Sequence, residues 1–160
     1  MGAILRSCDA VGVMRVMMVY YIETPPEIAA TSASGALKWL NFESYRSIKA
    51  CYDVLRAEGF QILATKIEPQ ARSLYSYDLA KPTAIVLGNE HRGISTEAAE
   101  GADGLAYIPM RGMVESVNVS VAAAIGLFEA MRQREAKGMY ATPQLSQELL
   151  RSELQTWIKK

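Results

Sequence analysis

Three separated segments of the chain carry the polar and glycine residues that could perform chemistry. The first contains Arg6, the second is Gly88–Gly93, and the third is Ile108–Asn118. The second and third follow apolar runs that read as strands. In an open α/β sheet, ligands bind beyond the carboxyl ends of the strands. The three segments are therefore the candidates for a ligand or catalytic site.

The second segment, GNEHRG, has two glycines around four polar residues. Glycine there permits a sharp turn or a close approach of the backbone to a ligand. The spacing is not G-x-G-x-x-G, and no Gly-Lys-Ser/Thr follows, which disfavours ordinary dinucleotide and nucleoside triphosphate binding. Alone, the pattern is more typical of a tight turn than of a site.

The third segment places Ser116, Asn118 and Ser120 at the start of a helix, ahead of a small-residue run through Ala124. This is typical of an N-cap with a closely packed face. Free backbone N–H groups at a helix start also suit an anionic or carbonyl-bearing ligand. Arg6, on a helix of its own, is by itself more typical of a solvated surface charge.

The elements that must position these residues alternate in type. Strands and helices in turn, with wholly apolar strands such as Thr83–Leu87, indicate an α/β fold with a mainly parallel sheet flanked by helices. We find no repeat or linker, so residues 1–160 are predicted to form a single domain. The expected helices are Gly2–Gly12, Ser44–Glu58, a short one after Ser95, Val117–Ala136 and Ser146–Lys160, and the expected strands are Val13–Ile22, Trp39–Phe42, Phe60–Lys66, Thr83–Leu87 and Leu105–Ile108.

Composition limits the classes of function. Lys and Arg number 17, as do Asp and Glu, so any RNA binding must come from a local patch or a dimer. Cys8, Cys51 and a single histidine lack metal-ligand spacing, and we predict no metal site and reduced thiols in a cytoplasmic protein. No signal-peptide pattern is present, and no apolar run reaches the ~20 residues of a membrane span.

Taken together, the three segments resemble the three signature motifs of the SpoU branch of the SPOUT methyltransferases. Ala3–Val13 is similar to the first motif, Ile85–Ser95 to the second and Ile108–Arg134 to the third. The stretch Ser34–Trp39 and the tail from Gly138 are similar to the tRNA (guanosine-2′-O)-methyltransferases that act on the D-loop. The resemblance implies methylation of a ribose 2′-OH in RNA, with S-adenosylmethionine as cofactor and tRNA as substrate.

The resemblance also implies a fold and a set of contacts. It implies a C-terminal trefoil knot and a homodimer with each active site near the interface. Phosphate contacts would come from Arg6, Arg92 and Arg111. Contacts to the cofactor, largely through main-chain groups, fall on Ala64, Thr65, Leu87, Gly88, Ile108, Met110, Ser116 and Val117.

By the same carry-over, the catalytic residues are Arg6, Glu90, Ser116 and Asn118. Arginine is essentially always protonated, so our hypothesis is that Arg6 binds the RNA phosphate and stabilises the developing alkoxide. The proton could leave through that phosphate or through an Arg6 perturbed by its neighbours. Glu90 and Asn118 are expected to orient loops and Arg6.

One departure from the family pattern keeps alternatives open. The chain starts at Met1, so the asparagine that begins the first motif, three residues before Ala3, is absent, as are an upstream helix and strand. We therefore expect a domain that is N-terminally truncated relative to the family. The alternatives are a SpoU-type enzyme acting on ribosomal RNA or the tRNA wobble position, a catalytically weak RNA- or cofactor-binding protein, and a generic α/β ligand-binding domain.

Overall fold

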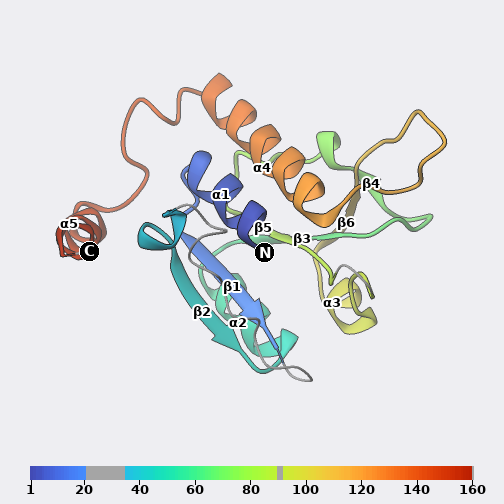
Figure 1. The fold of residues 1–160 in the computed structure, drawn as a ribbon, viewed down its shortest axis with the longest axis horizontal. Coiled ribbons are helices and arrows are strands. Elements are labelled where there is room, and N and C mark those ends of the chain that lie inside the picture. The colour runs from blue at the N-terminus through green and yellow to red at the C-terminus, as the bar shows by residue number, and fades with distance from the viewer. Residues whose placement is uncertain (21–34, 90–91, 160) are drawn as a thin grey trace.

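The computed structural model describes residues 1–20, 35–89 and 92–159. Every strand pairing in these residues is parallel, as the apolar strands predict. A two-stranded sheet has the order β1-β2, and a four-stranded sheet has the order β4-β6-β3-β5 (Figure 1). The strands are β1 (Arg15–Val19), β2 (Asn41–Tyr45), β3 (Gln61–Thr65), β4 (Arg72–Ser73), β5 (Thr83–Val86) and β6 (Gly104–Tyr107).

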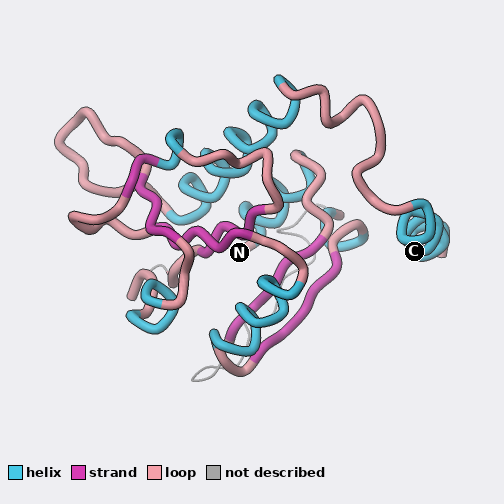
Figure 2. Tube along the Cα trace, turned by 180° about the vertical axis from the view of Figure 1, so that it is seen from behind, coloured by secondary structure: helices cyan, strands magenta, loops and turns pink. Residues whose placement is uncertain are grey.

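Helices pack on the sheets from two sides (Figures 1 and 2). The helices are α1 (Gly2–Ala10), α2 (Ile48–Ala57), α3 (Thr96–Glu100), α4 (Val119–Ala136), α5 (Gln147–Ile158) and the 3₁₀ turns η1 (Ala36–Lys38) and η2 (Leu74–Ser76). α1 and α4 pack on one side, α2 and α3 pack on the other, and among the described residues α5 belongs to none of the buried clusters. The α/β prediction of a mainly parallel sheet flanked by helices is confirmed. The trefoil knot and the single domain stay predictions.

Alternation along β3 separates two of the buried cores. Ile62 packs with the buried residues of α2 and α3, whereas the next residue, Leu63, packs with Leu74 and with Ile125 of α4. Successive side chains of a strand point to opposite faces, so β3 must be covered on both. A third buried cluster joins α1 to the β1–β2 sheet through Leu5, Cys8 and Leu40.

The segment Ser44–Glu58 differs from its prediction. Its helical periodicity is real from Ile48 onward, but Ser44 and Tyr45 belong to β2 and pair with Met18 and Val19 of β1. Ser47 caps α2 by accepting a hydrogen bond from the N–H of Ala50 at 3.1 Å. Pairing with a neighbouring strand outweighs a local periodicity here. Accordingly, the strand predicted at Trp39–Phe42 lies further along the chain.

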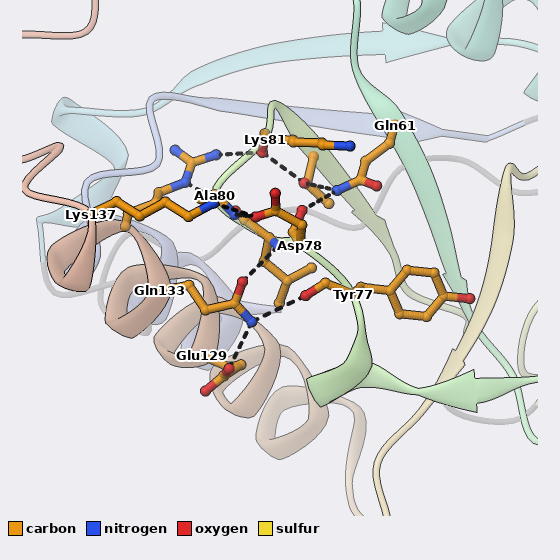
Figure 3. Close-up of polar contacts among 11 residues, drawn as sticks. Gln61, Tyr77, Asp78, Ala80, Lys81, Glu129, Gln133 and Lys137 are labelled. Carbon is orange, nitrogen blue, oxygen red and sulfur yellow. Dashed lines mark hydrogen bonds and ion pairs between the residues drawn. The ribbon is translucent and has the colours of Figure 1, made fainter.

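The C-terminal half of α4 is fastened to the loop before β5 (Figure 3). The Gln133 side chain accepts a hydrogen bond from the N–H of Leu79 at 2.8 Å and donates to the carbonyl of Tyr77 at 3.2 Å. Lys137 pairs with Asp78 at 2.9 Å. These contacts join residues more than fifty positions apart and fix the axis of α4 relative to the sheet.

Both cysteines are free and buried, as predicted. Burial raises the pKa of the Cys8 thiol to about 11, because the charged thiolate is poorly solvated there. The thiol is therefore protonated at neutral pH.

Candidate active site at the carboxyl edge of the sheet

The carboxyl ends of three adjacent strands meet at one edge of the larger sheet. β3 lies between β5 and β6, with Ala64 opposite Val86 and Thr65 opposite Ala106. The Thr65 hydroxyl donates a hydrogen bond to the carbonyl of Val86 at 2.9 Å and so ties the ends of β3 and β5 together. The topology therefore brings together the predicted cofactor-binding residues Ala64, Thr65, Leu87, Gly88, Ile108 and Met110.

The loop after β5 closes on itself. The backbone of Asn89 exchanges two hydrogen bonds with Gly93, of 3.0 and 2.8 Å. A Cβ atom on Gly88 would lie 2.2 Å from the carbonyl carbon of Gly93, so only glycine fits beneath the closed loop. Arg92 is exposed on it. The predicted catalytic residue Glu90 lies outside the described residues.

The segment after β6 leads from the same edge to α4. Ile108 and Met110 are half-buried, and residues 111–116 are exposed, including Arg111 and Ser116. Asn118 is the N-cap of α4, and its Oδ1 accepts hydrogen bonds from the N–H and the hydroxyl of Ser120 at 2.8 and 2.7 Å. The N-cap interpretation is confirmed, and Val117 lies half-buried just before it.

Arg6 lies on a different surface, between α1 and α4. It is exposed and lines an open hollow of about 320 Å³ together with Ala3, Ser7, Ala10 and Phe128. Phe128 is ten residues beyond Asn118, which at 1.5 Å per residue places it roughly 15 Å along the helix. Among the described residues, one chain therefore holds Arg6 well away from the start of α4 and does not bring it together with Ser116 and Asn118.

Two of the predicted phosphate-binding arginines, Arg6 and Arg111, have no ion-pair partner among the described residues. Within the same residues, 1–20, 35–89 and 92–159, Arg15, Lys66 and Lys137 do form ion pairs. An arginine with no carboxylate partner keeps its donors available for phosphate. This agrees with the phosphate-binding hypothesis for Arg6 and Arg111.

Several residues near the edge were not predicted from sequence. Lys66, directly after β3, pairs with Glu68 at 2.6 Å. Its hydrogen bond lowers the pKa of that carboxyl group. The pair lines a hollow of about 170 Å³ with Thr96 and Glu100 of α3. Their position just past a strand end was the available signal. No sequence signal marked Phe128 as a site residue, because apolar residues of a helix usually lie in the core.

Two classes of site find no support in the described part of the chain. No group of three His, Cys, Asp or Glu side chains there is arranged to hold a metal ion. In the same residues, no helix is long and apolar enough to cross a membrane.

Comparison with known proteins identifies the family. The model of the SpoU rRNA Methylase family matches residues 1–128. The chain belongs to the SpoU methylase family. The tRNA (guanosine(18)-2′-O)-methyltransferase of Thermus thermophilus is 42% identical over 160 residues, which is 100% of this chain and 82% of that protein.

Solved structures of SpoU enzymes have the same fold. A TrmH/SpoU tRNA-modifying enzyme of Aquifex aeolicus superposes with a TM-score of 0.90 at 40% identity, covering 98% of this chain and 79% of that one. The SpoU methyltransferase AviRb of Streptomyces viridochromogenes, solved with the cofactor AdoMet, superposes with a TM-score of 0.72 at 28% identity. The match covers 84% of this chain and 55% of that one.

The carboxyl edge suits the AdoMet of such enzymes. Half-buried apolar side chains at Leu87, Ile108 and Met110 offer surfaces for an adenine ring and a methionine chain. Backbone groups past the ends of β3, β5 and β6 supply donors and acceptors for their polar atoms. The cofactor-binding set named from sequence therefore fits this group chemically.

Proposed function

We propose that this SpoU enzyme transfers a methyl group from S-adenosylmethionine to a ribose 2′-OH in RNA, and that its substrate is a guanosine in the D-loop of tRNA. The observation that carries this is the 42% identity to a tRNA (guanosine(18)-2′-O)-methyltransferase along the whole chain. The carboxyl edge of β3, β5 and β6 supports it, because six of the eight predicted cofactor-binding residues belong to these strand ends or the segments directly after them.

In the proposed reaction, the cofactor supplies a methyl group activated by its sulfonium. A bond would form between the ribose oxygen and the methyl carbon as the carbon–sulfur bond breaks to leave S-adenosylhomocysteine, and the hydroxyl proton would pass to the RNA phosphate that Arg6 binds. Arg6 binds the adjacent phosphate and stabilises negative charge that develops on the oxygen. Asn118, fixed as the N-cap of α4, and Ser116 before it line the approach to the acceptor. Positioning of this kind accounts for much of the rate in two-substrate reactions.

The proposed active unit is a homodimer of residues 1–160 acting on RNA in the cytoplasm. The support is the hollow between α1 and α4, where Phe128 is 45% exposed, together with Val121 nearer the start of α4, which is 46% exposed. Such apolar exposure beside a predicted catalytic arginine is typical of an interface. A second chain seated on this surface would bring Arg6 near an α4 start that its own chain does not reach.

The experiment is tritium transfer from labelled S-adenosylmethionine to unmodified tRNA, followed by mapping of the methylated nucleotide. We expect Arg6→Ala to lower the transfer rate at least about 100-fold, as loss of a charge-stabilising donor does elsewhere. Arg6→Lys should also be impaired, since lysine lacks the planar fork. The matched control is Arg46→Ala, an exposed arginine between β2 and α2.

Ribosomal RNA is the second candidate substrate, because the family model that matches this chain is described as the SpoU rRNA Methylase family. Transfer to ribosomal RNA but not to tRNA would select it. Full rates in both Arg6 variants would remove Arg6 from the mechanism. If the protein bound S-adenosylmethionine but transferred no methyl group to either RNA, it would be a cofactor-binding protein and not a methyltransferase for these RNAs.

A further inference from the structure

The loop between β6 and α4 has an apolar tip that the fold leaves in water. Met113 is 100% exposed and Val114 is 63% exposed. Figures 1 and 2 both show this loop extending outward past β4. Removing apolar side chains from water is favourable, so a surface that covered this tip would be held by it.

The position of the tip indicates what that surface is. The loop begins beside Ile108 and Met110 at the proposed cofactor site, and it ends at Ser116, two residues after Val114. The tip is therefore the middle of a short segment whose two ends carry predicted cofactor-binding and catalytic residues. The tip is also distinct from the hollow of Phe128 that we assign to the second chain.

Charges of both signs flank the tip: Glu115 directly follows Val114, and Arg111 on the other side is the group that can bind a phosphate. Arg111, two residues before Met113, is exposed and has no ion-pair partner in the part of the chain that the structure describes. A guanidinium matches a phosphate through two parallel hydrogen bonds. An unstacked base presents a flat apolar face, and the flexible thioether of methionine adapts to such a face.

We propose that Met113 and Val114 contact the base of the nucleotide whose ribose is methylated, while Arg111 binds an adjacent phosphate. The inference rests on the proposed function, since it requires an RNA substrate. It assigns the tip a part in substrate recognition that the cofactor-binding and catalytic residues do not perform.

A double-mutant cycle between the tip and the base tests this. One partner is the double variant Met113→Ser with Val114→Ser. The other is substrate RNA that keeps the target ribose but lacks its base. We expect kcat/KM of the wild-type enzyme to fall at least tenfold on the abasic RNA, and that of the variant to fall at least tenfold on intact RNA. On abasic RNA, kcat/KM of the double variant should be no more than twofold below that of the wild-type enzyme.

Four measurements keep the outcomes apart. Ile158→Ser, which alters a side chain of α5 that is 85% exposed, should stay within twofold of wild type on both RNAs. Calorimetry should show unchanged affinity of the double variant for S-adenosylmethionine. Its melting temperature and its mass in solution should also match those of wild type.

The inference is overturned if the loss on abasic RNA is as large in the double variant as in wild type, or is absent in both. It is equally overturned if the variant dissociates to single chains, because the tip would then contact a second copy. In each of these cases wild type still methylates RNA and the proposed function stands. Failure of wild type on every RNA would refute the proposed function itself.

Discussion

At the scale of single residues, Gly88 has the least room for a side chain among the glycines Gly12 to Gly138 that the structure describes. A Cβ there would meet the carbonyl carbon of Gly93 at 2.2 Å and the nitrogen of Ile94 at 2.4 Å, all backbone atoms that cannot rotate away. We expect Gly88→Ala to open the closed loop and to weaken S-adenosylmethionine binding at least tenfold by calorimetry. The control is Gly112→Ala, whose added Cβ would meet nothing within 4 Å.

Equal cofactor affinity in the two glycine variants would show that the closed loop does not shape the cofactor site. The sequence predicted Gly88 as a contact because of its motif, and the geometry adds a separate reason for glycine there. Phe128 shows the opposite case. An apolar residue inside a long helix is usually buried, and only the placement of α1 beside α4 reveals its exposure.

At the scale of elements, local signals predicted most helices and strands, and tertiary pairing explains the misses. Capping serines at Ser95 and Ser146 marked the starts of α3 and α5, and both accept the expected backbone hydrogen bonds. β4 was missed, because two residues carry no periodicity and Arg72 and Ser73 become a strand only by pairing with β6.

The fastening of α4 by Gln133 gives a prediction at this scale. Gln133→Leu leaves the N–H of Leu79 and the carbonyl of Tyr77 without that partner in a partly buried place. We expect a loss of about 2 kcal/mol in unfolding free energy. For a chain of this size, that lowers the melting temperature by roughly 4–8 °C in calorimetry.

Gln155→Leu is the matched control, since the same exchange on α5 alters an exposed side chain. A drop of the same size in both variants would mean that the leucine, not the lost hydrogen bonds, is responsible. No change in either would show that the contacts of Gln133 are replaced by water without cost.

At the scale of the whole molecule, one chain separates residues that the proposed reaction needs together. The carboxyl edge of the sheet and the start of α4 form one region, and Arg6 lies in the hollow beside Phe128. Sequence patterns predicted both groups but could not show their separation, which depends on the packing of α1 against the middle of α4. The proposed homodimer resolves this by joining the two surfaces.

Phe128→Asp tests the homodimer directly, because a carboxylate in an apolar interface is strongly disfavoured. Sedimentation of wild type should give twice the chain mass of 17.6 kDa, and that of Phe128→Asp should give a single chain. Ile158→Asp on α5 should remain paired. The single-chain form should keep S-adenosylmethionine binding within about threefold and lose methyl transfer at least 100-fold, as removal of a charge-stabilising donor does. A single-chain form with full transfer would mean that Arg6 reaches the acceptor within its own chain, or is not needed.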